Sequence, residues 1–422
     1  MKLALHHLAR LMALAGIVSP DAFATNGYLF HGNGIKIQGQ AGVSIAMPQD
    51  ALAAANNPAG TVWIGNRFDI GATLFAPERV AEIEGNGAGA NGHYKGNARR
   101  VFLLPEFGVI KQLTDRFGVG VAVYANGGMN TEYKSNPYAA FGSRGSAGVN
   151  LSQVFITPSV AYKFTERNAF GIALNIVYQS FSAKGLSAFA NPQFSSDSAN
   201  MSERGHDNSL GVGLRLGWQG QLTDVLTLGA VWSSKIKARK FDRYAGLFAN
   251  GGSFDVPENY GVGVAYKLTP RLTLGADIQE IRYGHVRSVG NDFDAASLFA
   301  GNRFGSANGP GFGWRDITVY KFAASYALTP TLTIRGGYSH ADQPISGNQT
   351  FLNILAPGVI QDHASIGLTW SMRSDSELSM AYTHGFEKTV KGRNSISQTF
   401  GGGESNIKMS QNIVGVAYAW KF

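Results

Sequence analysis

The feature of this sequence that most constrains its fold is a short turn between two stretches in which apolar residues occupy every second position. The clearest case surrounds Pro270, with apolar positions at Tyr260, Val262, Val264, Tyr266 and Leu268 before the turn and at Leu272, Leu274, Ala276 and Ile278 after it. A period of two is that of a β-strand with two unlike faces. Pro270 cannot donate to a ladder and therefore belongs between strands. Similar turns near Asp115, Glu166, Asp224 and Pro330 predict an array of antiparallel hairpins.

The face opposite the apolar positions carries small or polar residues, as at Gly261, Gly263, Ala265 and Lys267. A soluble sheet of this size needs a second layer or a set of helices to cover its apolar face. No stretch of the sequence is long enough as a helix to supply that cover. A closed barrel whose apolar face meets lipid needs none, so the expected fold class is all-β, a transmembrane antiparallel β-barrel.

About fourteen segments have the length of roughly 9 to 11 residues expected of tilted barrel strands. They begin near Arg67, Arg100, Phe117, Gln153, Ala169, Ser209, Val225, Phe254, Leu272, Trp314, Leu332, Asp362, Leu378 and Asn412. Short turns alternate with long excursions, as periplasmic turns and outer loops do in bacterial barrels. The barrel is therefore expected over residues 67–422, with both of its ends in the periplasm.

The two ends of the chain carry export features. Lys2 and Arg10 precede or flank a short apolar core, and Ala24 completes a small-x-small cleavage site, so residues 1–24 are expected to be a cleaved signal peptide. The last strand alternates apolar residues up to Phe422 and resembles the recognition signal of the outer-membrane barrel assembly machinery. We therefore expect an integral protein of the bacterial outer membrane, in monomeric form, in contact with outer-membrane lipid.

Charge and cysteine content exclude other classes. The net charge is +8, but lysine and arginine are scattered singly and form no basic run, which argues against nucleic-acid binding. With no cysteine, neither a disulfide framework nor a thiolate metal site is available. The histidines are dispersed without metal-ligand spacing, so no metal and no cofactor are expected.

Residues 25–66 do not alternate. Within them, residues 49–55 read as a short helix that Asn56, Asn57 and Pro58 bring to an end. A barrel of about fourteen strands is too wide for its own wall side chains to fill. The segment is therefore expected to be an N-terminal hatch that plugs the lumen.

The chain resembles the FadL-type family of outer-membrane transporters for long-chain fatty acids and aromatic hydrocarbons. The resemblance rests on the hatch motif Asn57, Pro58 and Ala59, on the strand ends at residues 159–163, 263–267 and 335–339, and on the strand count. It implies capture of a hydrophobic small molecule among outer loops, rearrangement of the hatch, and sideways exit into the membrane at a kink in the third strand. Here that strand covers residues 117–125 and is followed by Asn126, Gly127 and Gly128.

Long-chain fatty acids or similar hydrophobic molecules are the expected cargo of this passive transporter, which would be no enzyme. A transporter of monoaromatic hydrocarbons or other xenobiotics on the same fold is the first alternative. A barrel-type outer-membrane lipase or adhesin is the second. His363 and Ser365 have the spacing of a barrel lipase pair, but no orienting group or oxyanion donor accompanies them, so we interpret them as polar wall residues.

Two sets of residues are candidates for contact with cargo. Apolar loop residues would touch it directly or pack on one another as a cap; they are Leu298, Phe299, Phe304, Phe351, Leu352, Ile354 and Leu355. Alternation also turns three cations into the lumen, namely Arg215, Lys321 and Arg335. An inward cation could anchor a carboxylate or could join an ion network with wall acids such as Asp277.

Overall fold

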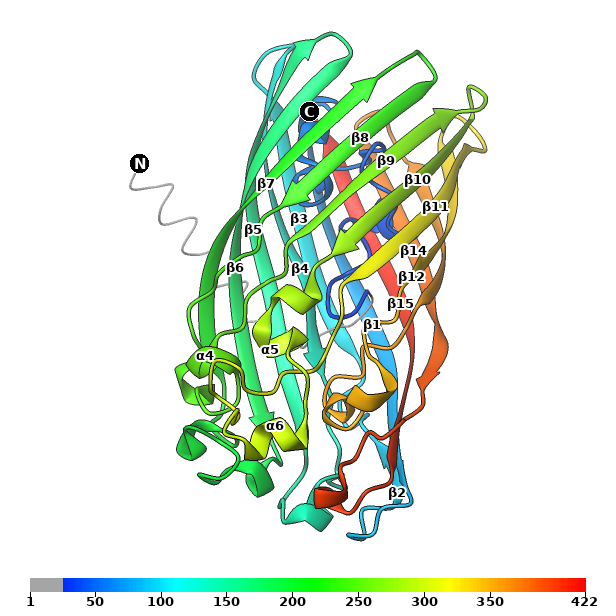
Figure 1. The fold of residues 1–422 in the computed structure, drawn as a ribbon. Helices are drawn as coiled ribbons and strands as arrows, with labels where there is room; N and C mark the ends of the chain where they lie inside the picture. The colour runs from blue at the N-terminus through cyan, green and yellow to red at the C-terminus, as the bar shows by residue number, and fades with distance from the viewer. Residues whose placement is uncertain (1–25) are drawn as a thin grey trace.

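A computed structural model describes residues 26–422, so the expected signal peptide and Thr25 lie outside the described part. Within that part, fourteen strands form one closed antiparallel barrel, and the short strand β2 extends the sheet beside β1 (Figure 1). Pairing of β15 with β1 closes the ring. The strands are β1 (Arg67–Glu84), β2 (Gly92–Lys95), β3 (Phe102–Gln112), β4 (Phe117–Asn130), β5 (Gly148–Thr165), β6 (Asn168–Lys184), β7 (Asp207–Gln221), β8 (Leu226–Ser233), β9 (Asn259–Lys267), β10 (Leu272–Ile281), β11 (Ile317–Ala327), β12 (Leu332–Ala341), β13 (Asp362–Ser371), β14 (Ser376–Val390) and β15 (Glu404–Lys421).

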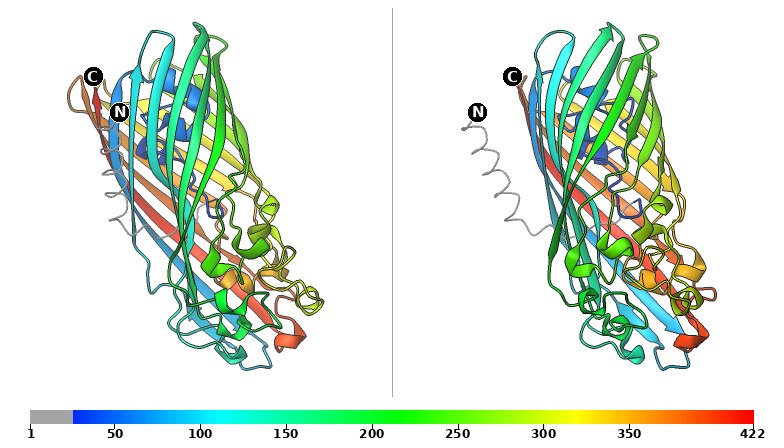
Figure 2. Two further views of the ribbon diagram at one scale, coloured as in Figure 1. Left: turned by 90° about the vertical axis from the view of Figure 1, so that its left-hand side faces the viewer. Right: turned by 60° about the vertical axis from the view of Figure 1, so that its left-hand side comes forward.

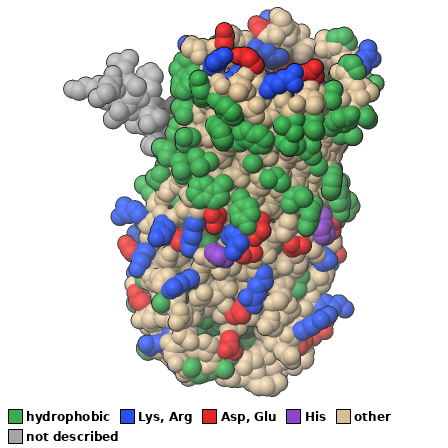
Figure 3. Space-filling model, turned by 45° about the horizontal axis from the view of Figure 1, so that its top comes forward, with side chains coloured by type: hydrophobic (Ala, Val, Ile, Leu, Met, Phe, Trp, Pro, Cys, Tyr) green, Lys and Arg blue, Asp and Glu red, His purple; other side chains and the backbone are tan. Residues whose placement is uncertain are grey.

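The barrel is apolar outside and polar inside, as the alternation predicts. On β9, Val262 is 57% exposed, whereas Asp277 of the neighbouring β10 points inward and is 2% exposed. Hydrophobic side chains gather in a belt near the turn end of the barrel, and charged side chains reappear beyond it toward the loops (Figure 3). The belt meets the requirement of a lipid-facing wall.

Several strands are longer than the predicted 9 to 11 residues, and β1, β5 and β15 reach 18 residues each. The extra length lies toward the loop end, where the strands continue past the apolar belt and carry the loops (Figures 1 and 2). Glu280 illustrates this. It keeps its outward place at the end of β10 with no register shift and bonds Arg282 at 3.0 Å, because the apolar belt has ended there.

The helices are short. Residues 26–66 contain α2 (Ile35–Gln38), α3 (Ala53–Asn56) and the 3₁₀ turn η1 (Pro58–Val62), and the loops contain α4 (Ala249–Gly252), α5 (Arg287–Gly290) and α6 (Ala295–Phe299). The helix expected over residues 49–55 begins only at Ala53. The carboxylate of Asp50 accepts the N–H of Leu52 at 3.0 Å, a local turn that competes with helix. Within residues 26–422, no helix is both long and apolar enough to cross a membrane.

Residues 26–66 lie inside the barrel, nearer its turn end, where Figures 1 and 2 show them as a dark blue coil surrounded by strands. Nearly all of their side chains are buried. We refer to residues 26–66 as the inner segment.

Candidate functional site

Carboxylates of the wall hold the inner segment by accepting its backbone N–H groups. Glu106 of β3 accepts from Ile35 at 3.0 Å, and Asp277 of β10 accepts from Ser44 at 2.7 Å. These N–H groups belong to irregular backbone or to the first turn of a helix, where no backbone partner is available within the segment. The wall thus supplies the hydrogen bonds that a sheet or a longer helix would otherwise provide.

An ion network near the turn end ties the inner segment to the closing strands. Lys36 of α2 lies 2.5 Å from Glu377 of β14, and Arg67 of β1 contacts both Asp69 at 2.7 Å and Glu377 at 3.1 Å. Lys421 of β15 also bonds Glu377. Because all of these charges have partners of opposite sign, they hold the structure together and offer no free charge to a ligand.

The motif Asn57, Pro58 and Ala59 fixes the end of the inner segment. The side chain of Asn57 accepts the N–H of Ala59 at 3.1 Å and donates to the carbonyls of Ile45 at 2.7 Å and Trp218 at 3.0 Å. Asn57 therefore caps η1 and links it both to the rest of the segment and to β7.

Inward glycines of the wall make room for this motif. A Cβ atom on Gly171 of β6 would lie 2.2 Å from the carbonyl carbon of Pro58, and one on Gly217 of β7 would lie 1.9 Å from Oδ1 of Asn57. Any side chain at these positions would displace the inner segment or the wall. The motif and the glycines therefore form one contact. The motif was identified from the sequence, but the glycines that face it were not.

A polar cavity of about 50 Å³ lies between the inner segment and the wall. Its lining includes Arg215 of β7 and Lys321 of β11, and none of the described residues that line it is acidic. Arg215 is 7% exposed; its Nε donates to Ser233 at 2.6 Å, while its Nη1 has no hydrogen-bond partner among the described residues. Lys321 donates to the carbonyl of His31 at 3.0 Å and to Gln279 at 3.1 Å. The structure thus brings two of the three predicted cations to one cavity.

The third predicted cation, Arg335, serves the inner segment. It donates to Thr369 of β13 at 2.8 Å and to Gln49 at 3.2 Å. Asp277, the predicted acidic partner, stands opposite Lys321 in the ladder, but no ion pair within 4.0 Å joins them in the described structure. Asp277 accepts N–H groups of the inner segment instead.

Two histidine rings stack beside the cavity. The rings of His31 and His363 are 5.8 Å apart and nearly parallel at 10°, and neither nitrogen of His31 has a hydrogen-bond partner within residues 26–422. His363 contacts Gln411 at 2.8 Å and Ser365 contacts Thr383 at 2.7 Å, so His363 and Ser365 form no hydrogen bond to each other. In the part of the chain that the structure describes, no group of acidic, histidine or cysteine side chains is placed to hold a metal ion.

The wall has an unpaired stretch between β3 and β4, which we term the window. The ladder between these strands ends at the pair Glu106 and Tyr124, although β3 continues beside β1 as far as Phe102. Just beyond the ladder, the register of β4 against β5 shifts between Ala125 and Gly127. The distortion lies in the third strand of the barrel at the glycines that the sequence analysis named.

The start of the inner segment fills the window from inside. Phe30 donates its N–H to the carbonyl of Asn126 at 2.9 Å, and Gly128 donates to the carbonyl of Tyr28 at 2.8 Å. These bonds replace those that β3 does not make. The Tyr28 ring lies 5.8 Å from that of Trp314, so the window also adjoins the loops.

The apolar loop residues pack together as a cap. Phe299 is 44% exposed, and the other six predicted residues are buried, namely Leu298, Phe304, Phe351, Leu352, Ile354 and Leu355. The ring of Phe351 lies 5.4 Å from Tyr138 and 6.2 Å from Phe400. These last two aromatic residues, Tyr138 and Phe400, were missed because they lie in loops, where no periodicity indicates burial.

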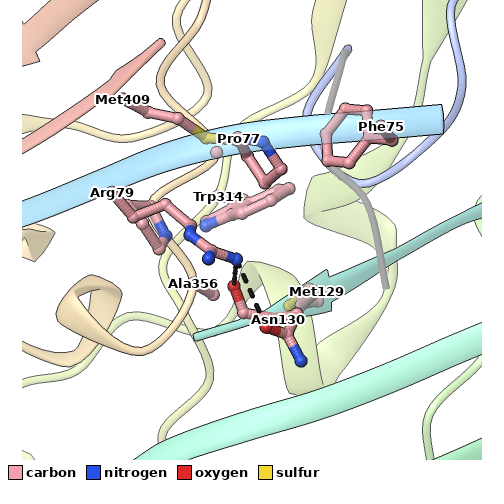
Figure 4. A pocket seen from close by; sticks show the side chains of 10 residues that line it. Phe75, Pro77, Arg79, Met129, Asn130, Trp314, Ala356 and Met409 are labelled. Carbon is pink, nitrogen blue, oxygen red and sulfur yellow. Dashed lines mark hydrogen bonds between the residues drawn. The ribbon is translucent and has the colours of Figure 1, made fainter. Parts of the chain in front are cut away.

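A second, much smaller pocket of about 10 Å³ lies at the loop end around Arg79 of β1 (Figure 4). Its walls include Phe75, Pro77, Met129 and Trp314. From the sequence, residues 78–99 were expected to form a long loop after the first strand. In the structure β1 continues to Glu84 and turns Arg79 inward.

Comparisons with known proteins agree with this architecture. A family model described as "Outer membrane protein transport protein (OMPP1/FadL/TodX)" matches residues 11–422. Outer membrane protein NMB0088 of Neisseria meningitidis serogroup B is 22% identical over 94% of this chain and 95% of its own length. Among solved structures, a FadL homologue of Pseudomonas aeruginosa superposes with a TM-score of 0.71 at 16% identity, covering 94% of this chain and 100% of its own. The toluene transporter TodX of Pseudomonas putida superposes with a TM-score of 0.69 at 19% identity, covering 93% and 99%.

Proposed function

The chain belongs to the OMPP1/FadL/TodX family of outer membrane transport proteins, and from that premise we propose that it takes up long-chain fatty acids. It is an outer membrane β-barrel transporter of hydrophobic compounds and not an enzyme. The solved relatives are less than 25% identical and include both a FadL homologue and a toluene transporter, so they leave the cargo open. The choice of fatty acid rests on the interior of this chain.

The cavity beside Arg215 is the observation that carries the proposal. A guanidinium nitrogen without a partner, close to Lys321 and with no acid in the lining, suits a carboxylate. Charge-assisted bonds of this kind are strong where water is excluded. Leu29, Phe30 and Val231 line the same cavity and would receive the start of an alkyl chain. Toluene carries no charge that could pair with these cations, so in a toluene site their burial would cost free energy without compensation.

The proposed route runs from the loop cap to the cavity and out through the window. The inner segment acts as a hatch, and release of Tyr28 and Phe30 from β4 opens the window toward lipid. Sideways exit keeps the alkyl chain out of water, which saves roughly 0.8 kcal/mol for each methylene group. The proposal also includes cleavage of residues 1–24 and contact of the strand ending at Phe422 with the barrel assembly machinery.

Uptake of labelled oleate and toluene, by cells that lack their own transporter, tests the cargo. The wild-type protein should raise oleate uptake, and Arg215→Met should lower that gain at least about tenfold, because methionine cannot replace the charged hydrogen bond to the carboxylate. The control Arg239→Met changes an exposed arginine of the β8–β9 loop and should leave uptake unchanged. A gain for toluene alone would favour the aromatic-hydrocarbon alternative, and no gain for either compound would remove the fatty-acid proposal.

A further inference from the structure

Arg79 is a buried cation whose charge has no counter-ion. Its side chain is 1% exposed, and its guanidinium donates only to neutral acceptors: Oδ1 of Asn97 at 3.3 Å, the carbonyl and Oδ1 of Asn130 at 2.7 and 3.2 Å, and the carbonyl of Arg99. Among residues 26–422, no carboxylate oxygen lies within 4.0 Å of it. Burial of a charge is costly unless an opposite charge compensates it.

The acids closest to Arg79 along the chain and across the barrel are engaged elsewhere. Glu78 points outward and lies 3.8 Å from Arg100. Glu132 lies 2.6 Å from Lys184 and 3.5 Å from Arg99. Neither acid is therefore a partner of Arg79 within residues 26–422. The positive charge is available to a partner that comes from outside the protein.

The surroundings of Arg79 suit the head of an amphipathic molecule. The guanidinium points into a pocket with walls of Phe75, Pro77, Trp314 and Met409 (Figure 4). Such walls exclude water and leave the guanidinium fork as the strongly polar group, and a planar fork matches the two oxygens of a carboxylate. The pocket also borders the window, since Met129 and Asn130 belong to the part of β4 that β3 does not pair.

The turn formed by Ala356, Pro357 and Gly358 closes this pocket and leaves only about 10 Å³ free. A Cβ atom on Gly358 would lie 2.7 Å from the Trp314 ring, so the turn rests directly on the pocket wall. Movement of this turn would admit a head group, and the longer bond of Nη1 of Arg79, to the side chain of Asn130 at 3.2 Å, is one that a carboxylate oxygen would replace.

We propose that Arg79 is the carboxylate-binding residue of an outer subsite, under the Ala356–Gly358 turn, where an anionic amphipathic cargo binds before it reaches the cavity at Arg215. This inference rests on the fatty-acid function proposed above. The subsite at Arg79 would be a second cationic binding site, on β1 and beside the window. The competing explanation is that Arg79 only ties β1, residues 97–99 and the end of β4 together.

The test compares two ligands that share one alkyl chain. Binding of labelled oleate and oleyl alcohol is measured for the purified full-length barrel in neutral detergent. The ratio of their dissociation constants is compared between variant and wild type at one detergent concentration, so that partition into micelles cancels. Arg79→Gln should weaken oleate binding about tenfold and leave oleyl alcohol binding unchanged, because only the carboxylate uses the charge. Arg79→Lys should retain part of the preference for oleate. The control Arg100→Gln, at an exposed arginine of the same end of the barrel, should match the wild type.

Equal loss of both ligands in Arg79→Gln, with no recovery in Arg79→Lys, would show that Arg79 is a structural tie and would overturn the proposal. An unchanged ratio in Arg79→Gln would overturn it as well. Failure of the wild-type protein to bind or take up oleate is a separate outcome, which would remove the fatty-acid function itself.

Discussion

At the scale of single residues, the barrel interior contains two kinds of buried charge: those in ion pairs and those with only neutral hydrogen-bond partners. Lys36, Arg67 and Glu377 form a closed network between the inner segment and the wall. Arg215 and Arg79 have only neutral partners within the described structure. Alternation could predict that Arg215 points inward, since a strand fixes the direction of its side chains. It could not predict which charges remain unpaired, because that depends on how the irregular inner segment folds against the wall.

His31 makes the closed state of the inner segment sensitive to acid. Burial lowers the pKa of its imidazole well below the ordinary value of about 6.5, and the nearby His363 and Lys321 lower it further. A released segment regains the ordinary pKa and takes up a proton first, so the closed state loses stability as the pH falls below about 6.5. Asp50 acts in the opposite sense, because burial and the adjacent Asp69 raise its pKa to about 6.

The measurement is leakage of small solutes from proteoliposomes between pH 7.5 and 5. Leakage through His31→Gln, whose side chain stays neutral throughout, should rise less toward the acidic end than leakage through the wild-type protein. The comparison isolates His31, since Asp50 is present in both proteins. The same acid response in His31→Gln would assign it to other groups.

At the scale of elements, the window and the inner segment are two parts of one device. β4 is regular where it pairs with β3. Beyond that ladder, its backbone forms hydrogen bonds with Tyr28 and Phe30 of the inner segment. Such an exchange follows the rule that buried backbone groups find partners. The strands themselves were predictable because their alternation is strong, and β1, β4, β10, β12 and β13 begin at the predicted residues. The strand extensions beyond the apolar belt were not, because the pattern inverts there: apolar residues such as Ile83 and Ile407 face inward, and polar residues face outward.

Gly171 is expected to control the seating of the inner segment without controlling the barrel. Gly171→Val places a side chain where Pro58 lies, and overpacking of this kind costs about 1 to 3 kcal/mol. The wall of β6 should still form, because valine favours strands. We expect a barrel that keeps its heat-modifiable migration on gels and leaks small solutes more than the wild type.

Gly336 provides the matched control. It lies on the outward face of β12, and the nearest atom to a Cβ there is the carbonyl oxygen of Ser365 at 3.8 Å. Gly336→Val should therefore leave leakage unchanged. If Gly171→Val were as tight as Gly336→Val, the contact between η1 and the wall would not retain the segment.

At the scale of the whole molecule, the barrel and its contents obey different rules. The wall is specified by a periodic pattern that recurs along most of the chain, and that pattern sufficed to predict the fold class and the strand number. The inner segment has no period, and its conformation depends on single contacts such as those of Asn57 with Ile45 and Trp218. Its place in the lumen followed from the width of the barrel, but its contacts could not be read from its own residues.

Removal of residues 25–60 tests the hatch as a unit. The strands close on one another without it, so the truncated protein should still assemble and resist denaturant as a barrel. It should also conduct ions in planar bilayers, where the full-length protein conducts poorly, because the lumen of a barrel this wide is not filled by its own wall. A truncated barrel with the conductance of the full-length protein would show that these residues do not seal the lumen.

The pairing of β15 with β1 has a consequence for biogenesis. The ring joins the first strand of the wall to the last. The barrel can therefore close only after the C-terminal strand has been inserted, and a partly inserted chain has no closed barrel. Contacts between such distant parts of a chain form slowly. Residues 26–66 precede every strand of the wall in the chain, so they are present while the sheet curves and before its two edges meet. Enclosure of the hatch is thus a matter of timing during insertion as well as of affinity.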